Sequence, residues 1–138
     1  MFKRIMVPVD LAHAGNIEKA LRVAGDIAKS SNADLVLVGA TTTEPSAIAH
    51  NPEEFAEKMA EFGAAASKRL GCTVHTEMIR SHDLRVDLDK ELLRKAGEMD
   101  VDLAVMATHK PGALEHLFSS NAGYLATHAP FSVMVVRG

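Results

Sequence analysis

Hydrophobic residues recur along the chain in two different patterns. Continuous apolar runs, rich in Val, Ile, Leu and Met, span Lys3 to Val9, Asp34 to Gly39, Asp102 to Met106, and Ser132 to Val136. Such runs predict strands that are buried on both faces of a parallel sheet, because helices cover both sides of a sheet of that kind. A fifth run, Thr73 to Ile79, alternates apolar with polar residues, which predicts an edge strand.

The stretches between these runs carry apolar residues every three or four positions, the period of an amphipathic helix. Helices are predicted over Asn16 to Lys29, Pro52 to Leu70, about Leu84 to Gly97, and about Asn121 to Thr127. Pro52 suits the first turn of its helix, where its missing N–H leaves no helical hydrogen bond unmade. Ser119, Ser120 and Asn121 form a predicted hydroxyl-rich turn whose side chains are suited to cap the last helix.

Strands and helices alternate along the whole sequence. This order predicts βαβ units with right-handed crossovers, and hence an α/β fold with a doubly wound parallel sheet. In that class, ligands bind beyond the carboxyl ends of the strands, at the point where the strand order reverses. The strand that ends before Asp10 and the strand that ends at Met106 are the natural pair, and the loop from Thr41 to Asn51 is expected over the same edge.

Length and composition favour one ordinary domain over residues 1–138. The 15 Lys and Arg residues are dispersed among 18 Asp and Glu residues, so the basic stripe of a nucleic-acid-binding protein is missing. No run approaches the ~20 apolar residues of a membrane-spanning helix, and Pro8 and Asp10 interrupt the first run before a signal peptide could form. Because Cys72 is the one cysteine, an intramolecular disulfide is excluded, and we expect a cytoplasmic protein with no membrane or nucleic-acid partner.

Two features of the chain together outline a nucleotide site. The loop after Met106 contains small residues and leads into a helix, whose first backbone N–H groups are free to bind a phosphate. Asp10 ends the neighbouring strand with a carboxylate that can accept hydrogen bonds from ribose hydroxyls. The same carboxylate could instead cap the turn or helix that follows it.

Other chemistries have less support in the sequence. The chain has neither a P-loop lysine motif nor a Gly-x-Ser-x-Gly elbow. A metal site needs three or more ligands at recurring spacing, whereas the seven histidines are scattered, although His109 and His116 lie near each other. Cys72 is expected to be a small apolar residue and not a nucleophile. We therefore expect no metal site and no catalytic residue.

Three separated motifs resemble the universal stress protein family, and together they cover the whole chain. They are KRIMVPVD from Lys3 to Asp10, LAVMATH from Leu103 to His109, and HAPFSVMVVR from His128 to Arg137. The resemblance is to small, single-domain bacterial members with a degenerate glycine motif. It implies a five-stranded sheet in the order 3-2-1-4-5 with helices on both faces. It also implies a homodimer joined through the last strand, here Ser132, Val133, Met134, Val135 and Val136.

The resemblance further implies an adenine-nucleotide site. ATP or another adenine nucleotide, with or without Mg²⁺, would contact Pro8, Val9, Asp10, Ala40, Met106, Ala107, His109, Lys110, Ser119, Ser120 and Asn121. Asp10 would bind the ribose, and the backbone of Ala40 would meet the adenine edge. Members that hold ATP carry three glycines at places where this chain has Ala107, Lys110 and Ser119. Lys110 could replace lost backbone contacts with a charge-assisted hydrogen bond to phosphate, or it could face water.

The resemblance predicts a stress-response protein that binds an adenine nucleotide and acts as a homodimeric module with little or no catalysis. Catalysis would need a base, a metal or an arginine aimed at the γ-phosphate, and only His109 and Lys110 stand in the loop. Two alternatives stay open. One is a family member that binds no nucleotide and acts through an unidentified protein partner; the other is a slow ATPase or nucleotidyl-transfer enzyme that uses His109.

Overall fold

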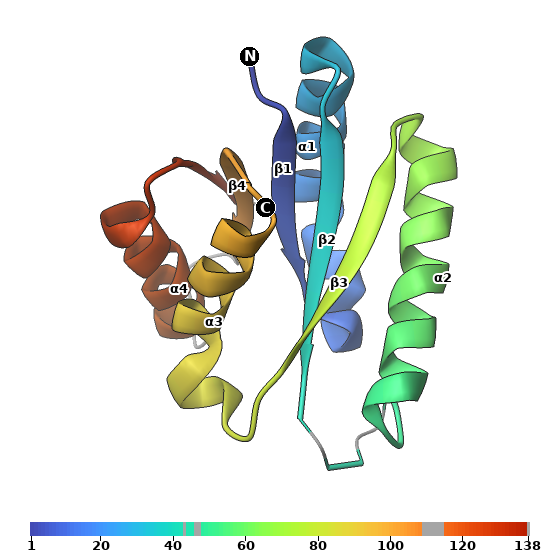
Figure 1. Ribbon diagram of the computed structural model, residues 1–138, viewed down its shortest axis with the longest axis vertical. Coiled ribbons are helices and arrows are strands. Elements are labelled where there is room, and N and C mark those ends of the chain that lie inside the picture. Colours follow the sequence, from blue (N-terminus) through green and yellow to red (C-terminus); the bar gives the residue numbers. More distant parts are fainter. Residues whose placement is uncertain (43, 46–47, 109–114, 138) are drawn as a thin grey trace.

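Five parallel strands form one sheet that is flanked by helices on both faces (Figure 1). The computed structural model describes residues 1–42, 44–45, 48–108 and 115–137, without the side chains of residues 84–86 and 115–120. The strands are β1 (Arg4–Val9), β2 (Asp34–Thr41), β3 (Val74–Arg80), β4 (Leu103–Thr108) and β5 (Ser132–Arg137). Their order is β3-β2-β1-β4-β5, so the predicted fold class and strand order are both confirmed.

Helices cover the two faces of the sheet in pairs. The α-helices are α1 (Glu18–Ser31), α2 (Pro52–Leu70), α3 (Leu84–Glu98) and α4 (Glu115–His128). In Figure 1, α1 lies behind β1 and β2 and α2 lies beside β3, whereas α3 and α4 stand on the other side of the sheet. The strand order reverses between β1 and β4, which makes the carboxyl end of that strand pair the expected ligand edge.

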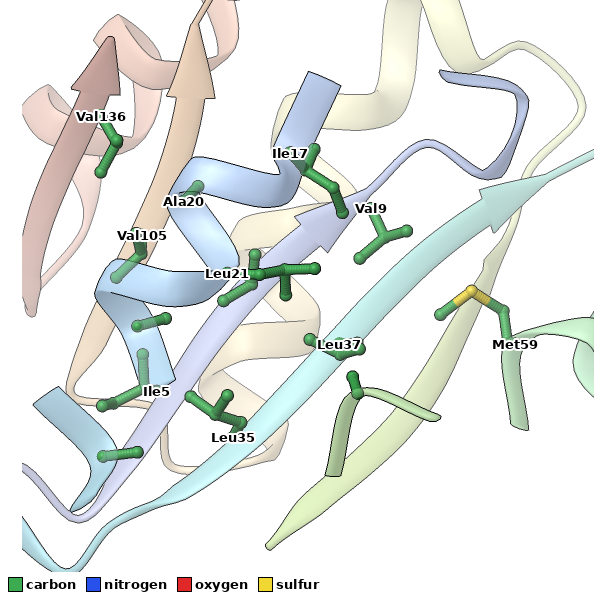
Figure 2. Close-up of a cluster of buried hydrophobic side chains, with 14 of the residues drawn as sticks. Ile5, Val9, Ile17, Ala20, Leu21, Leu35, Leu37, Met59, Val105 and Val136 are labelled. Atoms are coloured by element: carbon green, nitrogen blue, oxygen red, sulfur yellow. The ribbon is translucent and has the colours of Figure 1, made fainter. Parts of the chain in front are cut away.

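The central strands are buried on both faces, which explains why their sequences are continuously apolar. In β1, Ile5 faces the α1 side with Leu21 and Leu35, as Figure 2 shows, and the next residue, Met6, packs against the α3 and α4 side with Leu125. Side chains of successive strand residues point to opposite faces, so each face needs its own apolar set.

The two edge strands behave differently from each other. In β3, the side chains at alternate positions are exposed, so the predicted edge strand is confirmed. The prediction that β5 is buried on both faces is wrong, because Met134 and Val135 are 38% and 42% exposed. β5 pairs only with β4 and lies at the margin of the sheet, where the helices do not cover it fully. An apolar run therefore does not by itself distinguish a central strand from an apolar edge.

The last helix starts earlier than the sequence predicts. α4 begins at Glu115 and not near Asn121, so Ser119, Ser120 and Asn121 lie inside a helix and form neither a turn nor its cap. The prediction is wrong because Ser and Asn lower helix stability by only about 0.5 kcal/mol each relative to Ala. Such a cost is too small to end a helix that packs against β4 and β5.

A short 3-10 helix, η1 (Leu11–Ile17), connects β1 to α1 and was not predicted. Its N-cap is Asp10, whose side chain accepts a hydrogen bond from the Ala12 N–H. α2, in contrast, has its predicted bounds. Asn51 caps its start by accepting a hydrogen bond from the Glu54 N–H at 2.8 Å, and Gly71 ends it in the left-handed conformation, with φ 70°.

Candidate functional site

β1 and β4 are joined at their amino ends and separate toward their carboxyl ends. The paired positions between them are Ile5 with Leu103 and Met6 with Ala104; from Val7 onward no pair joins the two strands, both of which the structure describes in full. On its other side, β1 stays paired with β2 as far as Val9. The strands thus diverge at the point where the strand order reverses, which is where this fold class binds ligands; we call this divergence the crevice.

The closed end of the crevice is held by the carboxylate of Asp102. Its two oxygens accept hydrogen bonds from the backbone N–H groups of Lys3 and Arg4, at 2.8 and 3.0 Å. The Asp102 N–H in turn donates to the Arg4 carbonyl at 3.0 Å. These three bonds fix the start of β1 against the start of β4. The separation is therefore confined to the carboxyl ends.

Asp10 stands at the open end of the crevice and has two local partners. One carboxylate oxygen accepts the Ala12 N–H at 3.0 Å, and the other lies 2.9 Å from Nδ1 of His13. The capping role that the sequence left open is thus real. This role leaves the carboxylate able to accept further hydrogen bonds, because a carboxylate offers about four lone-pair positions. The Asp10 side chain remains 55% exposed and can accept further hydrogen bonds from a ligand.

Ala40, Asp10 and Thr108 occupy matching positions at the carboxyl ends of β2, β1 and β4, on the same face of the sheet. The pairing of Val9 with Gly39 places Asp10 level with Ala40. Continuing the register of Ile5 with Leu103 places Asp10 level with Thr108. By the alternation of strand side chains, all three lie on the sheet face that α3 and α4 cover. This row crosses the open end of the crevice.

The neighbouring residues offer a ligand mainly their backbones. The Val9 side chain is 6% exposed and belongs to the core on the α1 side, against which Ala107 also packs. The Met106 side chain is equally buried, on the opposite face. Pro8, which is half-buried, has no N–H to donate. Among the described residues at the crevice, the polar side chains are therefore few.

Several predicted site residues cannot be placed in the crevice. His109 and Lys110 lie outside the described residues. The backbones of Ser119 and Ser120 are in α4, and their side chains are not described. Asn121 is half-buried in the same helix. The structure thus brings together the β1, β2 and β4 parts of the predicted site, and the predicted phosphate loop stays a prediction.

Two described residues beside the crevice were missed by the sequence analysis. His13 is paired with Asp10, and the Asp-x-x-His spacing directly after a strand was the available signal. Thr108 ends β4, and its hydroxyl oxygen is buried with no hydrogen-bond partner among the described residues. A lone hydroxyl at the end of an apolar strand was the only sign of it. Its burial depends on packing that the sequence does not show.

The described residues do not support a metal site or a reactive thiol. In the part of the chain that the structure describes, no three His, Cys, Asp or Glu side chains are grouped to hold a metal ion. Because His109 is not among these residues, the expected absence of a metal stays a prediction. Burial raises the pKa of the Cys72 thiol above its ordinary value, which favours the unreactive protonated form. No helix among the described residues is long and apolar enough to span a lipid bilayer.

A separate groove of about 290 Å³ lies near the other end of the sheet. It is lined by Arg4, Val36, His75, Thr76, Glu77 and Met99. Its charged groups already have partners: Arg4 donates to the Met99 carbonyl at 3.0 Å, and Glu77 lies 3.3 Å from the amine of Lys95. It is a solvated, internally paired surface at a distance from the crevice.

Named relatives match the chain over nearly its whole length. Universal stress protein G of Salmonella typhimurium is 27% identical over 146 residues, which cover 99% of this chain and 100% of the relative. The protein of the same name from Escherichia coli O157:H7 is 28% identical over 145 residues, with the same coverage. Neither match leaves a sizeable part of either protein unaligned.

Solved structures of low sequence identity share the fold. A universal stress protein in complex with cAMP has a TM-score of 0.69 at 21% identity and covers 98% of this chain and 97% of its own. The protein from Archaeoglobus fulgidus in complex with dAMP has a TM-score of 0.69 at 17% identity, with 96% of each chain covered. An Arabidopsis thaliana family protein with AMP bound has a TM-score of 0.64 at 14% identity and covers 98% and 91%.

The family assignment rests on a match that leaves out only the last residue. The sequence model described as the universal stress protein family matches residues 1–137. The matched span includes all five strands and the crevice between β1 and β4. The chain therefore belongs to the universal stress protein family.

Proposed function

We propose that this protein binds an adenine nucleotide in the crevice between β1 and β4 and acts as a homodimeric stress-response module with little or no catalysis. The observation that carries the proposal is the separation of these strands, with the half-exposed Asp10 at its open end. Solved family structures that hold cAMP, dAMP or AMP support the choice of ligand, because all three are adenine nucleotides. A cytoplasmic location is part of the proposal and rests on the sequence.

In this proposal, Asp10 accepts a hydrogen bond from a ribose hydroxyl. The local cap and the contact with His13 fix the direction of the carboxylate, so little conformational freedom is lost when the ligand binds. Ala40 lies level with Asp10 on β2 and has a small side chain, which leaves room for a base against the backbone. Mg²⁺ would enter on the phosphates of the nucleotide, since this ion is usually held by phosphates with one or two carboxylates.

The proposal favours holding the nucleotide over cleaving it. Phosphoryl transfer needs groups that position the attacking oxygen and stabilise the charge on the γ-phosphate. The described polar side chains at the crevice are those of Asp10, Thr108 and His13, and His13 is held against Asp10. None of these is an arginine or a lysine. The loop residues His109 and Lys110 remain the candidates on which the enzymatic alternative depends.

A direct test looks for the ligand in two ways. Mass spectrometry of gently purified protein should detect co-purified adenine nucleotide, and titration calorimetry should show weak binding of AMP, ADP or ATP in the presence of Mg²⁺. No heat and no competition at millimolar nucleotide would contradict the proposal. That result would favour the alternative of a member that acts only through a protein partner.

Substitution of Asp10 tests the location of the site. We expect Asp10→Ala to weaken nucleotide binding by about tenfold or more, the effect of losing a hydrogen bond to a charged group. Lys110→Gly should weaken it less, because Lys110 stands where members of the family that hold ATP carry a glycine. Glu57→Ala, an exposed residue of α2, is the control and should bind as the wild type does. Equal affinity of the wild type and Asp10→Ala would remove the ligand from this crevice.

Phosphate release decides between the module and the enzyme. Purified protein incubated with ATP and Mg²⁺ should release phosphate far more slowly than working kinases, whose lower limit is about 1 s⁻¹. A rate at or above that limit that is abolished in His109→Ala and kept in Glu57→Ala would establish the enzymatic alternative instead.

A further inference from the structure

We propose that His13 is a specificity-determining residue of the crevice, which sets how strongly it prefers a charged nucleotide over uncharged adenosine. When the ring of His13 is protonated, it offsets the negative charge of Asp10, so that an anionic ligand binds more tightly at mildly acidic pH than at pH 8. The inference rests on the proposed function, in which Asp10 accepts a hydrogen bond from the ribose.

The first observation is that His13 is joined to Asp10 by its backbone and by its side chain. The His13 N–H donates to the Asp10 carbonyl at 3.0 Å, and Nδ1 of the ring lies 2.9 Å from a carboxylate oxygen of Asp10. His13 also departs from helical geometry inside η1, with φ −133° and ψ 44°, so the short helix bends at this residue. At this bend, the two contacts hold the ring beside the carboxylate.

The second observation concerns the proton on the ring. An ionised carboxylate only accepts hydrogen bonds, so Nδ1 of neutral His13 is the donor, and Nε2 is the nitrogen that can take up a further proton. The side chain is 65% exposed, so this proton can come from solvent. Histidine is the side chain that ordinarily changes its charge between about pH 5 and 8. The pair is therefore negative when the ring is neutral, and has no net charge when the ring is protonated.

The charge of this pair acts on a nucleotide because the phosphate is close to it. In the proposed function the phosphate is attached to the ribose that Asp10 binds, which places it within reach of charges screened over about 8 Å. The Asp10 carboxylate repels an anion at this range. Protonation of His13 removes the repulsion and keeps the contact that directs the carboxylate. Adenosine has no charge and gains nothing from the change.

The surroundings of His13 offer it one acidic partner. Among the described residues, Asp10 is the one charged group that is paired with His13. On α1, the helix against which η1 packs, Glu18 is paired with two arginines and Lys19 donates to a carbonyl at the end of β5. Residues 109–114 lie outside the described residues. The test therefore compares two proteins in which all of these other groups are the same.

The test compares the wild type with His13→Asn, whose amide nitrogen occupies the place of Nδ1 and which cannot be protonated. Calorimetry measures the affinity for AMP and for adenosine at about pH 5.5 and at pH 8. We expect the two proteins to bind AMP equally at pH 8, and the wild type to bind it about two- to fivefold more tightly at pH 5.5, the effect of one exposed charge pair. The phosphate of AMP itself gains a proton near pH 6, but it does so equally for both proteins.

Two controls accompany this comparison. Adenosine should bind equally to the wild type and to His13→Asn at both pH values, which also shows that the variant is folded. His75→Asn makes the same substitution in another exposed histidine, whose Nε2 lies 3.5 Å from the Asp34 carboxylate near the amino end of β3. Because this pair is distant from the crevice, His75→Asn should bind AMP as the wild type does at both pH values.

Four results would overturn the inference. They are equal AMP affinity of the wild type and His13→Asn at pH 5.5, a loss in His13→Asn that is as large at pH 8 as at pH 5.5, an equal loss for adenosine, and the same loss in His75→Asn. Each of them leaves the proposed function standing, because the wild type still binds AMP. A wild type that binds no AMP at either pH overturns the proposed function and this inference together.

Discussion

Single residues in this protein carry two roles at once, and Asp10 is the clearest instance. It caps η1 through one oxygen, contacts His13 through the other, and still has more than half of its side chain exposed. The sequence predicted its place, because a carboxylate that directly follows an apolar strand lies at the ligand-binding edge of this fold class. It could not predict that the hydroxyl of Thr108 is buried without a hydrogen-bond partner among the described residues, because this depends on how segments distant in sequence pack around one atom.

Cys72 gives a prediction about reactivity at the same scale. Burial raises the pKa of its thiol above the ordinary value of 9.0; Lys29 opposes the shift and Asp34 adds to it. Because the thiolate is the reactive form, iodoacetamide at pH 8 should alkylate Cys72 several times more slowly in the folded protein than in urea. Cys72→Ser provides the blank, and equal rates in both states would contradict the prediction.

The same shift has a consequence for stability at alkaline pH. The unfolded thiol ionises near pH 9.0, whereas the folded thiol ionises only at a higher pH. Between the two pKa values the unfolded state binds fewer protons, so the free energy of unfolding falls as the pH rises through this window. Cys72→Ser should lose less stability than the wild type between pH 8 and about pH 10, and urea unfolding at each pH measures the difference. An equal loss in both proteins would contradict the assignment to Cys72.

At the scale of elements, the sequence predicted the centre of the sheet better than its margins. The strands β1, β2 and β4 are buried on both faces, and this demand is visible as a continuous apolar run. β5 also has a continuous apolar run, but it is not buried on both faces: its exposed apolar residues, Met134 and Val135, lie at the edge of the sheet. The start of α4 was also misplaced, because the propensities of Ser and Asn are weak beside the packing of the helix on the sheet.

The glycine in the middle of α2 tests how closely this helix lies on β3. A Cβ atom added to Gly63 would lie 2.4 Å from Cγ2 of Thr76, so α2 or the strand would have to move. Gly63→Ala should therefore lower the free energy of unfolding by about 1–3 kcal/mol, although alanine is the better helix former. Outside its own helix backbone and chain neighbours, Gly123 in α4 has no atom of the described residues within 4 Å of such a Cβ, and Gly123→Ala should raise stability by about 0.5–1 kcal/mol.

Urea unfolding of both variants measures these effects with opposite expected signs. The second variant is the control, because it makes the same substitution in a helix with free space. If Gly63→Ala were as stable as the wild type, the close approach of α2 to β3 would be wrong.

At the scale of the whole molecule, the exposed edge of β5 is the expected dimer surface. The Ser132 N–H donates to the Asp102 carbonyl, so by the alternation of a parallel strand the backbone of Val135 points away from β4. The edge is partly capped, because the Lys19 amine donates to the Arg137 carbonyl at 2.7 Å. Unpaired backbone groups beside exposed Met134 and Val135 are a template for pairing with a second copy.

Proline at Val135 tests the proposed homodimer. The substitution removes an N–H that points outward, so the pairing of β5 with β4 should survive while pairing with another copy is lost. Light scattering should show a dimer for the wild type and a monomer for Val135→Pro. Thr76→Pro, on the opposite edge strand β3, should remain dimeric, and circular dichroism checks that both variants are folded. A monomeric wild type at high concentration, or a dimer undisturbed by Val135→Pro, contradicts the proposed interface.

The Asp102 carboxylate, which joins β1 to β4 at one end only, has a consequence for the exchange of backbone hydrogens with solvent. The N–H groups of Lys3 and Arg4 are held by this carboxylate and should exchange slowly. N–H groups that face the separated ends of the two strands have no strand partner there and should exchange much faster. A ligand that fills the crevice would slow only the second group. The difference between the two ends of one strand pair would then report occupancy without any label on the ligand.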